Sequence, residues 1–97
     1  MALSILIAGG GRVGTYLARI LSAEGHKVTI LEGESEEFSW LEQEFSSTML
    51  VRGDPADPHA LLNAGIKKTD VVAGVTRYDE LNLVVASLAK FEFKVKK

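Results

Sequence analysis

The stretch LSILIAGGGRVG, residues 3–14, decides the fold of this chain. Its first half, residues 3–8, is short, mostly apolar and rich in branched side chains, which is typical of a parallel strand buried on both faces. Glycines then make a turn, and apolar side chains recur at the spacing of one helix face: Val13, Tyr16, Leu17, Ile20 and Leu21. The stretch therefore predicts a strand, a tight turn and an amphipathic helix that packs on the sheet.

Strands and helices alternate along the rest of the chain. We expect further strands at residues 27–31, 48–51 and 70–75. Such alternation predicts an α/β fold, a Rossmann-like doubly wound parallel sheet with right-handed crossovers. We expect the strand order 3-2-1-4, with residues 70–75 inside the sheet because that run is continuously apolar. A fifth strand would be short or truncated.

Three further helices are expected. Ser35 begins one of them, because its hydroxyl can cap free amides and two acids follow it, and Asp57 caps the next helix ahead of Pro58. Gly25 and Gly65 end the preceding helices as left-handed caps. The expected buried stripes are Phe38, Leu41 and Phe45 in one helix, and Leu81, Val84, Val85 and Leu88 in the last.

Composition bounds what this domain binds. Its 97 residues suffice for one domain, 1–97, and the net charge of −2 gives no general attraction to nucleic acid or anionic lipid. No apolar run is long enough to insert into a membrane, and no basic leader precedes the first strand. The chain has no cysteine, and its two histidines have no partners at metal-ligand spacing, so we expect no metal site and a cytoplasmic location.

The glycine turn satisfies the pattern G-x-G-x-x-G between an expected strand and an expected helix, the context that this motif requires. Gly9 would make the tight turn, Gly11 would let the backbone approach a pyrophosphate, and Gly14 would let the helix press against the strand. The phosphates would meet the amides at the helix N-terminus, where Gly10 and Val13 are also expected to contact the ligand. A glycine-rich turn without a ligand is the alternative.

Glu32 ends the second expected strand, where dinucleotide-binding domains place an acid that accepts hydrogen bonds from the adenosine ribose. Glu34 is the alternative for this role, and a solvent-exposed glutamate would have the same sequence. An acid here disfavours the 2′-phosphate of NADP, because like charges about 4 Å apart repel by about 4 kcal/mol at an effective dielectric constant of 20. We therefore expect NAD(H), with ATP or ADP as alternatives.

Five blocks together resemble the KTN family, also called the RCK N-terminal or Trk-type NAD-binding domain. They are IAGGGRVG (7–14), EGHKVT (24–29), GDPAD (53–57), AGI (64–66) and TRYDELNL (76–83). The blocks occur in the order of the family and cover the chain from the first strand to the last helix. This combination is far more specific than the glycines alone.

The resemblance implies a regulator of potassium channels or transporters that binds a nucleotide and assembles as a dimer or larger ring. It would be cytoplasmic, held at the membrane only through a transporter subunit. By the family pattern, Arg12 lies near the phosphates, Asp54, Pro55 and Ala56 surround the adenine, and Thr76 lies near the far end of the nucleotide. A solvated Arg12, a turn-forming Asp54 and a helix-capping Thr76 are the structural alternatives.

Two features depart from the family. Pro55 stands where the family more often has alanine, which removes an amide. The chain also ends at Lys97, where the fifth strand of the family should begin, so we expect the last strands to be missing and self-association through residues 71–97. The alternative is that residues 91–95 fold back as a short covering strand.

Two other functions remain open from sequence. One is the cofactor-binding part of an NAD-dependent oxidoreductase, which would need an acid or base beside the nicotinamide. Neither tyrosine is followed four residues later by lysine, so the short-chain dehydrogenase signature is missing. The other is a Rossmann-like assembly module without a ligand. We expect the domain itself to have no catalytic residues.

Overall fold

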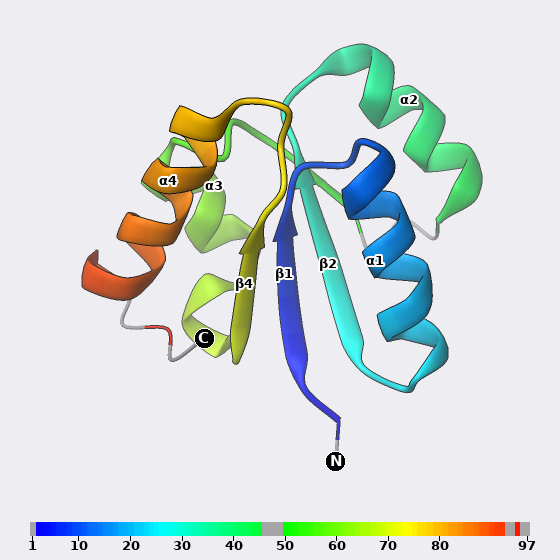
Figure 1. Cartoon of the computed structure of the whole chain (residues 1–97), viewed down its shortest axis with the longest axis horizontal. Coiled ribbons are helices and arrows are strands. Elements are labelled where there is room, and N and C mark those ends of the chain that lie inside the picture. Colours follow the sequence, from blue (N-terminus) through cyan, green and yellow to red (C-terminus); the bar gives the residue numbers. More distant parts are fainter. Residues whose placement is uncertain (1, 46–49, 93–94, 96–97) are drawn as a thin grey trace.

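The computed structural model describes residues 2–45, 50–92 and 95. In this part of the chain a four-stranded parallel sheet has the order β3-β2-β1-β4 (Figure 1). The strands are β1 (Ser4–Ala8), β2 (Lys27–Glu32), β3 (Leu50–Arg52) and β4 (Val71–Gly74). The helices are α1 (Arg12–Ala23), α2 (Ser35–Glu44), α3 (Pro58–Asn63) and α4 (Asp79–Ser87), with short turns η2 (Ile66–Lys68) and η3 (Leu88–Glu92). The predicted Rossmann-like architecture is confirmed.

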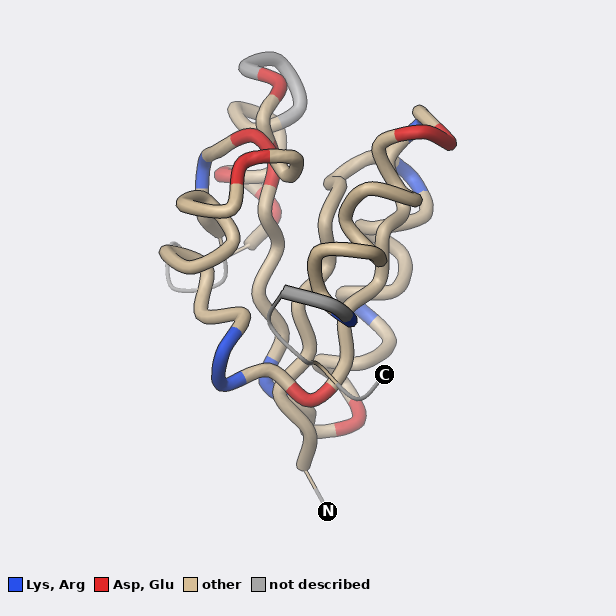
Figure 2. The backbone as a smooth tube through the Cα atoms, turned by 90° about the vertical axis from the view of Figure 1, so that its left-hand side faces the viewer, with Lys and Arg blue, Asp and Glu red and all other residues tan. Residues whose placement is uncertain are grey.

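The strand β1 is the centre of the sheet and is apolar on both faces. Its Ile5 and Ile7 share a cluster with Ala18 of α1 and Leu41 of α2. On the opposite face, Leu6 is packed with residues of β2, α3, η2 and η3: Leu31, Ala60, Leu61, Ala64, Ile66 and Ala89. Helices lie on both sides of the sheet (Figure 2), and the two cores beneath them explain why β1 has no polar alternation.

Helix α1 packs through its small residues and through only part of the stripe predicted from sequence. Gly14 and Ala18 are buried, whereas Val13, Tyr16 and Ile20 are 58%, 67% and 38% exposed. Small side chains let the helix axis approach the sheet closely, so the larger residues remain on a flank. Leu17 and Leu21 are half-buried beside the core, as predicted.

That exposed flank of α1 faces away from α2. Arg19 forms a 2.6 Å ion pair with Glu44 of α2, which places the side of α1 bearing Arg19 toward that helix. Ile20 and Val13 lie about 100° and 120° around the helix from Arg19, given about 100° of rotation per residue. They therefore lie on the flank turned away from α2, which is the flank nearer β4 in the strand order β3-β2-β1-β4.

The helix ends agree with the sequence in most places. Gly25 and Gly65 have φ values of 91° and 88°, and the Asp57 carboxylate accepts a 2.9 Å hydrogen bond from the His59 amide. The predicted cap at Ser35 is wrong, because Glu34 occupies the cap position and Ser35 is already helical.

Two predicted apolar stripes differ in part from the structure. Leu41 is buried and both Phe38 and Phe45 are half-buried, as expected for a core face. In α4, however, Val85 is buried while Val84 is 42% exposed, so the prediction for Val84 is wrong. Strand β3 begins at Leu50, and the predicted residues 48–49 lie outside the described part.

The strand β4 lies at an edge of the described sheet and not inside it. Its only described neighbour is β1, with Ile5 opposite Val71 and Ala8 opposite Gly74. Residues Leu88–Glu92 are helical, so a covering strand does not begin at residue 91, and residues 93–94 lie outside the described part.

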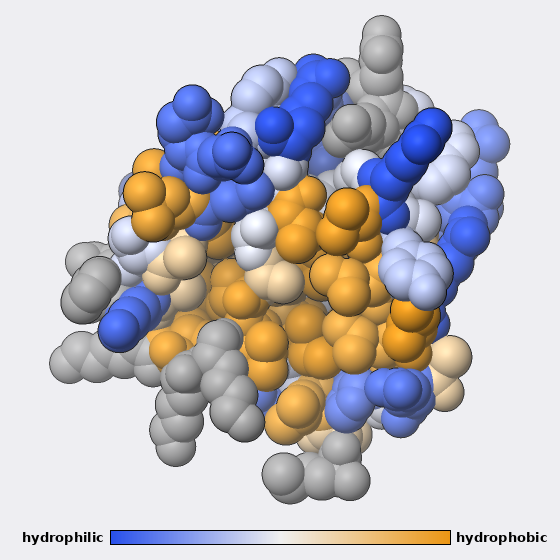
Figure 3. Space-filling model, in the orientation of Figure 1, coloured by the Kyte–Doolittle hydropathy of each residue, from blue (hydrophilic) through white to orange (hydrophobic). Residues whose placement is uncertain are grey.

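One face of β4 is only partly covered by the helices that the structure describes. Val71, Ala73 and Val75 alternate onto the face that carries α1, and all three are half-buried. We call these three residues the open face. Figure 3 shows apolar surface continuing across the middle of this side of the molecule. The apolar flank of α1 borders the same surface.

Candidate functional site

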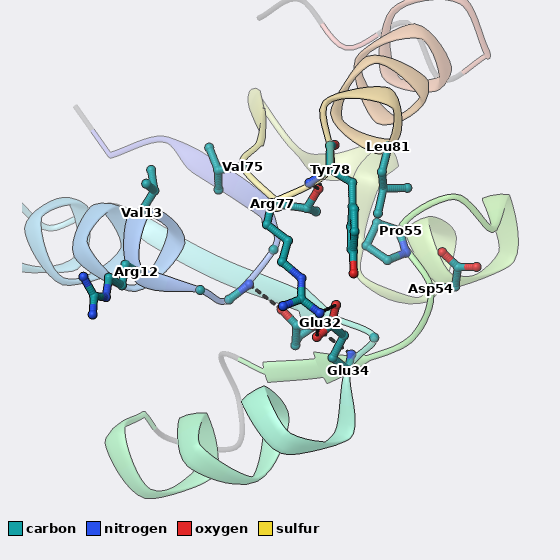
Figure 4. Close-up of a pocket in the computed structure, with 15 residues that line it drawn as sticks. Arg12, Val13, Glu32, Glu34, Asp54, Pro55, Val75, Arg77, Tyr78 and Leu81 are labelled. Carbon is teal, nitrogen blue, oxygen red and sulfur yellow. Dashed lines mark hydrogen bonds and ion pairs between the residues drawn. The ribbon is translucent and has the colours of Figure 1, made fainter.

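A crevice of about 510 Å³ opens at the carboxyl ends of β1, β2 and β4 (Figure 4). In a doubly wound sheet this is the switch point, where chains leave adjacent strands in opposite directions and ligands bind. The lining residues are Gly9, Gly10, Gly11, Arg12, Val13, Glu32, Gly33, Glu34, Asp54, Pro55, Val75, Thr76, Arg77, Tyr78 and Leu81. Most of the predicted site residues therefore meet in one place.

The glycine turn fits its neighbours closely at Gly9, Gly10 and Gly14. Gly9 has φ of 119°, and a Cβ added there would stand 2.8 Å from the Thr76 amide nitrogen. A Cβ at Gly14 would overlap the Gly9 carbonyl oxygen, and one at Gly10 would overlap Leu41. Gly14 does not line the crevice, and its role is the predicted close packing of helix against strand.

Glu32 is an anchor of the turn. The residue is only 5% exposed, and its Oε1 accepts a 2.6 Å hydrogen bond from the Gly10 amide. Oε2 accepts a 2.8 Å hydrogen bond from the Glu34 amide. A carboxylate has about four acceptor positions, so two amide donors leave capacity for ligand hydroxyls. The predicted ribose contact of Glu32 stays a prediction.

The loop after β3 supplies part of the opposite wall. Pro55 is buried and lines the crevice together with Asp54. The Asp54 carboxylate accepts a 2.9 Å hydrogen bond from the Ala56 amide, so Asp54 forms a turn and lines the crevice at once. Ala56 is not among the lining residues, and its predicted place around the adenine is not supported by this geometry.

The loop between β4 and α4 is held by Thr76 and Asn82. The Thr76 amide donates to the Asn82 side-chain oxygen at 2.7 Å, and the Asn82 amide group donates back to the Thr76 carbonyl at 3.0 Å. Tyr78, and not Thr76, occupies the cap position of α4. The helix-capping alternative for Thr76 is therefore wrong, although its hydroxyl accepts the Tyr78 amide at 3.1 Å.

Sequence reasoning missed three side chains of this loop region, Arg77, Tyr78 and Leu81. Figure 4 shows Arg77 extending across the crevice toward Glu34, with Tyr78 and Leu81 beside Pro55. One guanidinium nitrogen of Arg77 lies 3.1 and 3.2 Å from the two Glu34 carboxylate oxygens. The signal available in the sequence was a cation and an aromatic ring directly after the strand that borders the switch point.

Arg12 behaves differently from Arg77. It is exposed, and its side chain points away from the centre of the crevice (Figure 4). Val13 beside it is also exposed, at the rim. The predicted phosphate contact of Arg12 would need its side chain to turn inward.

These residues suit a nucleotide. Gly11 and the first residues of α1 line the crevice, and the first turn of α1 contains no acidic residue. The free amides and positive dipole of this helix start therefore favour an anion in the crevice. Pro55, Tyr78 and Leu81 offer apolar surface to a base, and Glu32 lies between these two regions. A crevice of this construction defines the class as a Rossmann-type nucleotide-binding domain.

Comparison with known proteins identifies the family. The TrkA-N domain model matches residues 5–97, so this chain belongs to the TrkA-N domain family. The resemblance to the KTN or RCK N-terminal family is thereby confirmed.

Relatives and a solved structure agree. The chain is 41% identical to the Trk system potassium uptake protein TrkA homolog of Pyrococcus abyssi, over 89% of this chain and 37% of that protein. It is 36% identical to the Trk system potassium uptake protein TrkA of Haemophilus influenzae, over 89% of this chain and 19% of that protein. A structure titled Shewanella denitrificans Kef CTD in AMP bound form matches with a TM-score of 0.76 and 27% identity, covering 94% of this chain and 54% of that chain.

None of the helices in the described part of the chain has the length and hydrophobicity that crossing a membrane requires. Among the described residues, no group of three or more His, Cys, Asp or Glu side chains is placed to hold a metal ion.

Proposed function

We propose that this chain is a nucleotide-sensing regulatory domain of a potassium transport system, with NAD(H) as the favoured ligand and ATP or ADP as alternatives. The observation that carries the proposal is the crevice at the switch point. There the glycine turn, the start of α1 and the buried Glu32 face one space of about 510 Å³. NADP is disfavoured because its 2′-phosphate would approach Glu32 and Glu34.

The comparisons support this proposal. Two similar proteins are named as Trk potassium uptake proteins, and the similar solved domain is titled as bound to AMP. The chain spans 37% and 19% of the length of those two relatives, so the potassium transporter subunit as a partner is itself part of the proposal. A cytoplasmic location follows from the same proposed role.

The proposed ligand contacts follow the walls of the crevice. Gly9, Gly10, Gly11 and the start of α1 at Arg12 and Val13 would hold the phosphates, and Gly14 would keep the helix close behind them. Glu32 would accept the ribose hydroxyls. Asp54, Pro55 and Thr76 would border the base and the far end of the ligand.

We propose a regulatory and not a catalytic role, against the oxidoreductase alternative. Membership of the TrkA-N family favours regulation, and no substrate chamber beside the crevice is needed for it. Incubation of the protein with NADH should leave the absorbance at the reduced nicotinamide band steady. Steady turnover of NADH would contradict this part of the proposal.

The decisive experiment is to identify and then titrate the ligand. Mass spectrometry of nucleotide retained by the purified protein should find NAD(H) or an adenine nucleotide. Calorimetry should then give saturable binding of the same compound with one site per chain. Absence of binding for NAD, NADH, ATP, ADP and AMP would favour the assembly-module alternative and overturn nucleotide sensing.

We also propose that a second copy of the chain covers the open face at Val71 and Ala73, as far as the crevice that Val75 lines. This apolar surface lies at a sheet edge and continues into the exposed flank of α1, and such surfaces favour association. Light scattering at micromolar concentration should give more than the mass of one chain. Ile20→Lys, in the α1 flank, should restore a monomer, whereas Leu83→Lys on α4 should not; a monomeric wild-type protein would contradict the proposal.

A further inference from the structure

The ion pair between Arg77 and Glu34 joins the two walls of the crevice. Arg77 comes from the loop between β4 and α4, and Glu34 precedes α2, 43 residues earlier in the chain. The guanidinium nitrogen Nη2 lies 3.2 Å from Oε1 and 3.1 Å from Oε2. Both residues line the crevice, so the pair spans the space in which a ligand would lie.

The charges of the crevice make Arg77 the cation available to a ligand. Three acids line the space, Glu32, Glu34 and Asp54, against Arg12 and Arg77. Arg12 points away from the centre, whereas Arg77 extends across it (Figure 4). A phosphate entering this space would therefore meet a guanidinium that is paired with a carboxylate.

The pair is suited to exchange. The side chains of Arg77 and Glu34 are 66% and 40% exposed, and ion pairs with such exposure contribute little to stability. A phosphate offers a guanidinium the same oxygen acceptors as a carboxylate, and with more negative charge. The Arg77 guanidinium also lies 5.1 Å from the Tyr78 ring centre, so that ring supports the side chain over the crevice.

We propose that Arg77 selects ligands that carry a 5′-phosphate, and that Glu34 is its counter-ion when the ligand is absent. The phosphate replaces Glu34 at Arg77, and Glu34 turns toward solvent. This inference rests on the proposed nucleotide-binding function and adds a rule of selectivity to it. Glu34 then competes with the ligand, in contrast to Glu32, whose carboxylate is fixed by two backbone amides.

The test compares 5′-AMP with adenosine by calorimetry at one salt concentration. Arg77→Gln should reduce the ratio of AMP affinity to adenosine affinity about tenfold, as expected for loss of one hydrogen bond to a charged group. Glu34→Gln should raise that ratio about threefold, because the competing charge is gone. In the Arg77→Gln background, Glu34→Gln should give no further gain.

Matched controls come from a second surface ion pair. Arg19 and Glu44 are 55% and 38% exposed and lie outside the crevice lining. Arg19→Gln and Glu44→Gln remove the same charges from the chain and should leave the ratio within about twofold of wild type, since exposed charges act weakly at a distance in salt. If both pairs changed the ratio of AMP affinity to adenosine affinity equally, the net charge of the chain would explain the effect, and the proposal would be overturned.

Three other outcomes would overturn the selectivity rule. Equal losses of AMP and adenosine affinity in Arg77→Gln would show that Arg77 covers the nucleoside. Weaker AMP binding in Glu34→Gln would make Glu34 a ligand and not a competitor. A larger effect of Arg77→Gln on 2′-AMP than on 5′-AMP would place the contact at the ribose. In each of these cases nucleotide binding itself stands. A wild-type protein that binds neither AMP nor adenosine but binds NAD(H), ATP or ADP overturns the selectivity rule alone, and one that binds none of these compounds contradicts the proposed function.

Discussion

The two walls of the crevice are built in opposite ways. On the side of β1 and α1, the wall is backbone held by a buried carboxylate, and Glu32 is 5% exposed. On the side of β4 and α4, the wall includes the exposed side chains of Arg77 and Tyr78, with Tyr78 45% exposed. The first wall provides a fixed shape, and the second provides groups that can move. Changes to the residues that hold the first wall in shape, Gly14 and Glu32, should therefore alter folding, and changes to the exposed side chains of the second wall should alter binding alone.

The largest effect is expected for Gly14→Ala. The new methyl group would overlap the Gly9 carbonyl oxygen, and both atoms belong to the backbone frame of the turn and cannot easily move. We expect a loss of about 3 kcal/mol in the free energy of unfolding, which lowers Tm by at least about 10 °C.

Gly25→Ala provides the control for this substitution. Gly25 has φ of 91° but open space around its Cβ position. The substitution should therefore add only backbone strain, which lowers the free energy of unfolding by about 1 kcal/mol. A Gly14→Ala variant as stable as Gly25→Ala, measured by thermal melting, would mean that the close contact of α1 with the turn is not required.

The second effect concerns the two glutamates. Glu32→Gln would place an amide donor where two backbone N–H groups require acceptors, so we expect a loss of about 2 kcal/mol in unfolding free energy. NAD or AMP affinity should also fall several-fold. Glu34→Gln should change stability by less than about 0.5 kcal/mol, as usual for an exposed residue. Urea unfolding measures both changes in stability, and a larger loss for Glu34→Gln than for Glu32→Gln would show that the Glu32 carboxylate does not hold the turn.

Gly11→Ala should separate binding from folding. Gly11 has φ of −75°, which other residues adopt, and it precedes α1 at the crevice. A methyl group here would stand between the backbone and a pyrophosphate, so nucleotide affinity should fall about tenfold while the cooperative melt is retained. Normal affinity in calorimetry would show that the ligand does not lie across this turn.

The smallest effect is expected for Tyr78→Ala. Loss of an exposed ring that borders the base region should weaken adenosine binding about threefold, with unfolding free energy within about 0.5 kcal/mol of wild type. Trp40→Ala offers a comparison, because that ring is 46% exposed on α2 and does not line the crevice. Equal changes in adenosine affinity for both variants would remove Tyr78 from the site.

Local backbone geometry, including the glycine turn of the first wall, was predictable from sequence, whereas the side chains Arg77, Tyr78 and Leu81 of the second wall were not. Glycine positions, strand ends and caps depend on local backbone geometry, so Gly9, Gly25, Gly65 and Asp57 could be assigned residue by residue. The ion pair of Arg77 with Glu34 joins loops 43 residues apart, and no local pattern fixes how such loops approach each other.

The packing of α1 was mispredicted for a related reason. Hydrophobic spacing located the helix and placed Leu17 and Leu21 correctly beside the core, but it also placed Val13, Tyr16 and Ile20 on the buried face. The structure buries Gly14 and Ala18 because small residues allow the closest approach to the sheet. The side of a helix that faces a sheet depends on how closely the helix axis can approach the sheet, and the hydrophobicity of its residues alone does not determine this.

The carboxylate of Glu32 has a consequence for hydrogen exchange. The amides of Gly10 and Glu34 belong to turns outside the sheet ladder, where exchange with solvent water is usually fast. Because both amides donate to a buried carboxylate, at 2.6 and 2.8 Å, their protons should exchange as slowly as those of the neighbouring strands. The NMR signals of the Gly10 and Glu34 amides would then report local opening of the glycine turn before any ligand is added.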